Sequence, residues 1–175
     1  LGPEKNLDLV IFSFVEALKI DSDLKLTITG RNDSSSTSEC VLYLKFLIEG
    51  LGCGDRIRLI ENPSDENLIT EIGTSNVMIC AQNCDFNLTV YEGLYLGKQV
   101  VVPATYDFPV QLADSKNIHN GNIQREDFTS SLMKASNSTY TYDENEREFL
   151  SAFTYDNYAK SISDFITQNI SQLRG

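Results

Sequence analysis

Histidine and basic residues are scarce in this sequence, and no apolar run reaches membrane-spanning length. One histidine and four cysteines are present, and only Cys80 and Cys84 are close together. Their spacing, with no second pair or histidine beside them, does not match a zinc site, so we expect no metal and interpret the cysteines as reduced packing residues. The 25 acidic residues outnumber the 14 basic ones, which gives a net charge of −11. That charge argues against nucleic acid as a partner, although a local pocket for a phosphate stays compatible with it.

The start of the chain carries neither an initiator methionine nor a recognisable signal peptide. It opens on Leu1-Gly2-Pro3-Glu4-Lys5, which reads like the middle of a protein. We therefore expect residues 1–175 to form a single domain excised from a larger two-domain protein, and this length can bury a sizeable core. Without a signal peptide or a membrane span, the expected location is cytoplasmic.

Short unbroken apolar runs alternate with segments of helical periodicity along the chain. The runs predict strands at 24–29, 57–60, 77–80 and 99–102. Helices are predicted from Pro3 to about Ile20, after a polar loop at 31–38, after Ser64, at 88–96, at 125–135 and from Asp143 onward. Segment 104–124 gives no clear pattern. Such alternation predicts an α/β fold, a Rossmann-like three-layer α/β/α domain with a mostly parallel sheet.

A ligand of such a sheet is expected beyond the carboxyl ends of the strands. Four loops are expected to meet there: the loop at Gly30 and Arg31, the turn at Glu61 and Asn62, the loop 82–87 and the loop 103–107. The free amides at the start of the 88–96 helix suit an anion, and Glu92, one turn into that helix, suits a pair of sugar hydroxyls. The combination predicts a site for a nucleotide sugar.

Several stretches stand in a fixed order along the chain: PEKNLDL, LKLTITG, LGCGDRIRLI, NLITEIGTSNVMIC and NLTVYEGLYLGKQVVV. Together they resemble the donor-binding C-terminal domain of retaining glycosyltransferases of the GT-B fold (family 4 type, group 1), in register over residues 1–103. The resemblance implies one half of a GT-B hexosyltransferase that moves a sugar from a nucleotide-diphosphate sugar to a glycan, lipid or protein acceptor. It implies no cofactor or metal. It also implies a missing N-terminal acceptor-binding domain, without which this chain is inactive, and it leaves peripheral membrane association of the full-length protein open.

The resemblance assigns the nucleotide end of the site residue by residue. Lys5 matches the lysine that contacts the donor diphosphate and stabilises it as it leaves, and the arginine that partners it would precede Leu1. Glu92 matches the second glutamate of the E-x7-E motif, which binds the ribose hydroxyls. The backbone donors to phosphate and sugar fall on Asn87, Leu88 and Thr89.

The sugar end of the site departs from the family pattern. The first glutamate of the motif falls on Cys84, and Asp85 beside it is the candidate replacement and a candidate catalytic residue. Gly30 and Arg31 are further candidates for contact with a phosphate.

Each assignment has a structural alternative. Lys5 and Glu92 could be solvated helix residues, Asp85 a loop or capping residue and Arg31 a solvated loop arginine, while His119 is expected to be structural or exposed. For the whole chain, Cys84 favours an alternative function, a catalytically inactive glycosyltransferase-like domain that acts as a binding or stabilising partner. An unrelated doubly wound binding domain, without any response to nucleotides, is the third reading.

Overall fold

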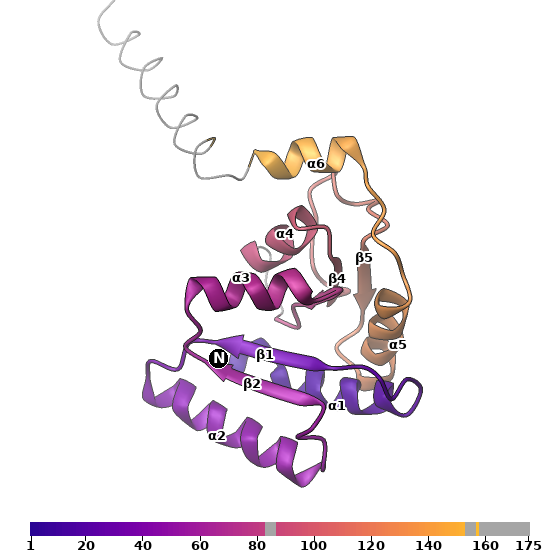
Figure 1. Cartoon of the computed structure of the whole chain (residues 1–175). Helices are drawn as coiled ribbons and strands as arrows, with labels where there is room; N and C mark the ends of the chain where they lie inside the picture. Colours follow the sequence, from indigo (N-terminus) through magenta and orange to yellow (C-terminus); the bar gives the residue numbers. More distant parts are fainter. Residues whose placement is uncertain (83–86, 153–156, 158–175) are drawn as a thin grey trace, which may run out of the picture. The chain divides into compact units, whose positions relative to one another are not determined.

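The computed structural model describes residues 1–82, 87–152 and 157. These residues group into two compact units, one formed by Leu1–Asp107 with Lys116–Tyr140 and the other by Phe108–Ser115 with the chain from Thr141 onward. Figure 1 shows the elements of both units along the chain. All of the predicted site residues that the structure describes lie in the first unit.

Every strand pairing described in the first unit is parallel. Strand β1 (Leu26–Gly30) pairs with β2 (Ile57–Glu61). Strand β4 (Gln99–Pro103) lies between β3 (Val77–Ile79) and β5 (Ile118–Gly121). The predicted α/β class with parallel strands is therefore confirmed. The strand β5 was not predicted, because its sequence, IHNG, lacks an apolar run and it is identified by backbone pairing with β4.

Helices connect the strands, and their bounds follow the predicted pattern with two corrections. The first unit contains the 3₁₀ turn η1 (Pro3–Lys5), α1 (Leu7–Leu18), α2 (Ser35–Gly50), α3 (Asp65–Thr74), α4 (Leu88–Tyr95) and α5 (Arg125–Ser136). The prediction of one helix from Pro3 to about Ile20 is wrong at Asn6, whose φ of 49° is left-handed and separates η1 from α1. Asparagine tolerates this conformation better than most residues.

The predicted loop at 31–38 is shorter than expected because serine and threonine cap the next helix. The Ser34 Oγ accepts the Thr37 backbone amide at 3.2 Å, and the Thr37 Oγ1 accepts the Ser34 amide at 3.0 Å. This reciprocal pair satisfies two amides that would otherwise lack partners, so α2 begins at Ser35. Ser64 caps α3 as predicted, with its Oγ accepting the Asn67 amide at 3.2 Å.

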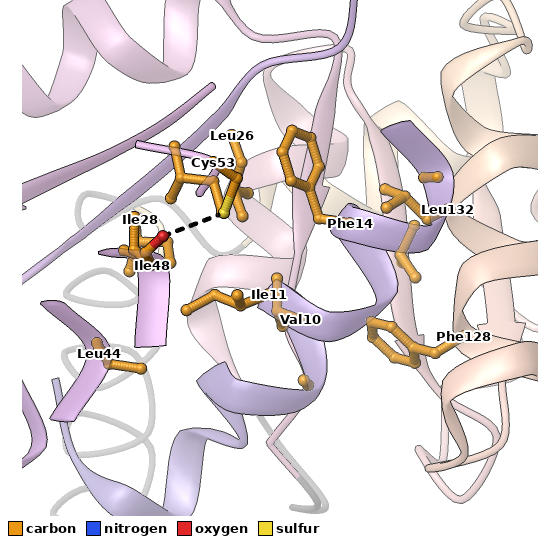
Figure 2. Packing of buried hydrophobic residues seen from close by; sticks show 14 of the residues in the cluster. Val10, Ile11, Phe14, Leu26, Ile28, Leu44, Ile48, Cys53, Phe128 and Leu132 are labelled. Carbon is orange, nitrogen blue, oxygen red and sulfur yellow. Dashed lines mark hydrogen bonds between the residues drawn. The ribbon is translucent and has the colours of Figure 1, made fainter. Parts of the chain in front are cut away.

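The core of the first unit is centred on α1. Figure 2 shows Val10, Ile11 and Phe14 of this helix between two groups of side chains. One group comes from β1 and α2, and the other comes from α5. The residues of these two groups labelled in the figure are Leu26, Ile28, Leu44 and Ile48, and Phe128 and Leu132. Because α1 begins directly after Asn6, this packing also fixes where the first residues of the chain lie.

The second unit contains α6 (Glu144–Ser151). Asp143 caps this helix, with its Oδ1 accepting the Glu146 amide at 3.0 Å, as the acidic helix start predicted. The closing helical pattern predicted beyond Ala152 lies outside the described residues, apart from Asn157. None of the helices in the described part of the chain is both long and apolar enough to cross a membrane.

Candidate functional site

The first residues of the chain are bonded to the segment that follows β3. The Lys5 Nζ donates to the Gln82 Oε1 at 2.5 Å, and the Asn6 Nδ2 donates to the Ala81 carbonyl oxygen at 2.8 Å. The left-handed backbone of Asn6 turns the chain here, between η1 and α1. The ammonium group of Lys5 therefore lies beside the start of the loop that leads from β3 to α4.

Asn87 begins α4 and is held from three sides. Its Oδ1 accepts the Thr89 amide at 3.0 Å and caps the helix, as an N-cap asparagine does. Its Nδ2 donates to the Cys80 Sγ at 3.0 Å, and its backbone amide donates to the Tyr106 hydroxyl oxygen at 2.8 Å. Two of the three backbone donors predicted here, those of Asn87 and Thr89, thus already have acceptors.

The Leu88 amide differs from its neighbours, since no acceptor for it occurs among the described residues. It stands at the positive end of the helix dipole, where an anion is stabilised. The side chains of Leu88, Thr89 and Glu92 are all exposed. Because they are spaced three and four residues apart, they share one face of the helix.

Glu92 lies on the side of α4 that turns away from the strands. Its carboxylate is exposed and makes no hydrogen bond or ion pair to any residue that the structure describes. The residues on either side, Tyr91 and Gly93, are buried. The structure therefore presents the Glu92 side chain on the exposed face of α4, one turn from the Leu88 amide at the start of the helix.

The ends of β1 and β2 form a separate hydrogen-bonded group. The Asn32 Nδ2 donates to the Glu61 Oε2 at 2.8 Å, and the Asn32 amide donates to the Asn62 Oδ1 at 2.8 Å. Hydrogen bonds from Lys45, first, and from Asn32 hold the pKa of the Glu61 carboxyl below its usual range. The side chain of Arg31 is exposed, and no contact joins it to Lys5 or α4 within the described residues. Gly30 packs against the start of the chain, where an added Cβ would come within 3.0 Å of the Leu1 Cγ.

His119 belongs to a buried polar cluster on the neighbouring strands. Its Nε2 lies 2.6 Å from the Gln99 Oε1, and the Gln99 Nε2 donates to the Asn117 Oδ1 at 3.1 Å. Burial, and to a lesser extent the positive charge of Lys134, holds the pKa of His119 below its usual range. These contacts give His119 a structural role in joining β4 to β5.

Cys84 and Asp85 lie outside the described residues, so the sugar end of the site remains a prediction. Among the residues that are described, no group of three histidine, cysteine, aspartate or glutamate side chains is placed to hold a metal ion. Gln82 and Tyr106 lie in loops that were predicted to meet here, but their individual contacts and the part played by Asn6 were not predicted. Only the ordinary preference of asparagine for turns could have pointed to Asn6.

Comparison with known proteins identifies the family of this chain. The family model for glycosyl transferases group 1 matches residues 1–166. A search of curated proteins finds no match.

Among solved structures, sucrose-phosphate synthase from Thermosynechococcus elongatus is similar, with a TM-score of 0.73, 18% identity and coverage of 93% of this chain and 42% of that one. Anabaena HepE in complex with UDP and glucose has a TM-score of 0.74 and 13% identity, and the match covers 95% of this chain and 46% of that one. The pneumococcal O-GlcNAc transferase GtfA in complex with UDP and GlcNAc has a TM-score of 0.72 and 15% identity, and the match covers 95% of this chain and 34% of that one. This chain thus spans less than half the length of these structures. It belongs to the glycosyl transferases group 1 family and has the fold of the C-terminal Rossmann-like domain of GT-B glycosyltransferases.

Proposed function

We propose that this chain is the donor-binding part of a glycosyltransferase and that it holds the nucleoside diphosphate of a nucleotide sugar beside the start of α4. The full-length protein transfers the sugar to a glycan, lipid or protein acceptor. The observation that carries the proposal is the contact of Lys5 with Gln82, because it brings a cation to the loop that leads into α4.

The two phosphates are bound by charge and by backbone donors. The Lys5 ammonium leaves Gln82 for the diphosphate, which is the stronger acceptor because it is charged. The Leu88 amide donates to a phosphate oxygen at the positive end of α4. Both groups stabilise the negative charge that develops on the diphosphate as the sugar departs, which makes Lys5 the catalytic residue that this chain contributes.

The ribose is bound by Glu92. Its exposed carboxylate accepts hydrogen bonds from two neighbouring hydroxyls, and such bonds to a charged acceptor are among the stronger ones in proteins. Asp85, Gly30 and Arg31 are carried forward as secondary candidates for contact with the sugar and the phosphates. No cofactor or metal takes part in this scheme.

The compartment we propose is the cytoplasm. Cys40 and Cys53 are free thiols, which suits a reducing environment. Burial raises the pKa of the Cys40 and Cys53 thiols above the usual range, which makes both poor nucleophiles. They act as packing residues.

A second candidate function is a catalytically inactive domain that binds or stabilises another protein. Cys84 favours it, because this residue stands where the family motif has its first glutamate. A domain of this kind keeps the fold but does not need to bind a nucleotide sugar.

Titration calorimetry with UDP, GDP and ADP, and with sugars attached to each, separates the two candidates. UDP is the first probe, since HepE and the pneumococcal GtfA were solved with it. Glu92→Ala removes the ribose contacts, and we expect the Kd of the best diphosphate to rise about 10- to 100-fold. Lys5→Ala should weaken the diphosphate but leave the corresponding nucleoside unaffected.

Glu66→Ala is the matched control, because Glu66 is also an exposed glutamate near the start of a helix, in α3. It should leave the Kd unchanged. If none of the three nucleotides binds, or if Glu92→Ala binds as tightly as the parent chain, the donor-binding function is excluded.

A further inference from the structure

Tyr106 lies just beyond the end of β4 and is fixed by its own backbone. The Ala104 amide donates to the Gly121 carbonyl at 2.8 Å, and the Tyr106 amide donates to the Pro103 carbonyl at 2.9 Å. These bonds form a turn that continues from β4 and β5. The side chain of Tyr106 is only 6% exposed, so the turn directs it into the protein.

The hydroxyl of Tyr106 joins this turn to the first turns of α4. It accepts the backbone amide of Asn87 at 2.8 Å and is also hydrogen-bonded to the hydroxyl of Tyr91. Asn87 and Tyr91 are four residues apart and therefore lie one above the other on the same side of the helix. A single side chain thus holds α4 at two points one turn apart.

The contact of Tyr106 with α4 lies next to the residues proposed to bind the ligand. Leu88 directly follows Asn87, and Glu92 directly follows Tyr91. The two residues held by Tyr106, Asn87 and the buried Tyr91, are thus the immediate neighbours of the two exposed residues, Leu88 and Glu92. A shift or rotation of the first turn would move the Leu88 amide and the Glu92 carboxylate together.

We propose that Tyr106 is a positioning residue for nucleoside diphosphate binding: its hydroxyl fixes the first turn of α4 so that the Leu88 amide and Glu92 are preorganised for the ligand. The inference rests on the proposed function of this site. It also implies that the Asn87 amide serves Tyr106 rather than a phosphate, so the diphosphate receives fewer backbone donors than the three predicted residues could offer.

The substitution Tyr106→Phe tests this role, because it removes the hydroxyl and keeps the ring in the core. The Kd of the chain for whichever of UDP, GDP and ADP binds most tightly is measured by calorimetry, together with the Kd of the corresponding nucleoside. We expect the diphosphate to bind about 5- to 20-fold more weakly. The nucleoside, which uses Glu92 but not the Leu88 amide, should be weakened to a smaller extent, about 2- to 5-fold. Hydrogen exchange at the Asn87 amide should accelerate in the variant, which reports the lost bond directly.

Tyr43→Phe is the matched control, since Tyr43 is an exposed tyrosine on α2, and it should change neither affinity. Unchanged diphosphate binding in Tyr106→Phe, with a folded chain by circular dichroism, overturns the positioning role. Tighter binding also overturns it, because Tyr106 would then be competing with the phosphate for the Asn87 amide. If the parent chain binds none of the three nucleotides, the proposed function fails first and this inference fails with it.

Discussion

Gly93 allows α4 to lie directly against β3 and β4, and adding one methyl group there should separate them. A Cβ at Gly93 would stand 2.9 Å from the Met78 Sδ, 3.2 Å from the Val100 Cγ2 and 3.3 Å from the Met78 Cβ. Replacing glycine by alanine inside a helix stabilises it by up to about 1 kcal/mol. Overpacking a tight contact costs about 1–3 kcal/mol, and Val100 is fully buried and cannot move aside freely. Gly93→Ala should therefore lower the free energy of unfolding by about 1–2 kcal/mol.

Thermal and urea unfolding followed by far-UV circular dichroism measure this change. For a chain of this size the loss corresponds to a drop in Tm of about 2–8 °C. Gly73→Ala in α3 is the control, because no atom lies within 4 Å of the added Cβ, and it should raise the stability by about 0.5–1 kcal/mol. The reasoning is refuted if Gly93→Ala is as stable as the parent chain or gains as much as Gly73→Ala.

Two further predictions concern the first unit. Because the pKa of His119 is lower in the folded chain, the unfolded chain binds a proton on this side chain first as the pH falls. The contribution of neutral His119 to the free energy of unfolding is therefore complete above about pH 6.5 and is lost as the pH drops through the folded pKa. His119→Gln should flatten this decline in urea midpoints measured between about pH 7.5 and pH 5.5, and an unchanged slope would contradict the assignment. Phe128 is completely buried between α5 and α1, so Phe128→Ala should cost about 3–5 kcal/mol in urea unfolding, and a loss under about 1 kcal/mol would show that the core there collapses around the cavity.

The elements that the sequence predicts well are those whose signal is local. Ser64 caps α3, and Gly97 ends α4 with a φ of 71°, as an end-of-helix glycine does. The continuous valine run of β4 is fully buried, in agreement with its apolar sequence. These features depend on residues a few positions apart, so local sequence patterns are enough to predict them.

The features that the sequence does not predict depend on contacts between distant segments. β5 contains His119 and Asn120, and only its pairing with β4 makes it a strand. The sheet topology predicts that the loop 103–107 lies near the loop 82–87, but it does not predict that Tyr106 bonds to Asn87, 19 residues away. No local sequence pattern connects Tyr106 with Asn87, so the hydrogen bond between Tyr106 and the start of α4 is seen only in the folded structure.

The bond between Lys5 and Gln82 has a consequence for how this protein reaches its native state. It joins residues 77 positions apart. Forming it therefore requires either that the intervening strands and helices have already folded or that a long loop is closed at an entropic cost. Local helices such as α2 form far faster than contacts of such long range. The region around the Lys5–Gln82 contact should accordingly be among the last parts of this unit to assemble during folding, and it cannot form during synthesis until Gln82 has been added.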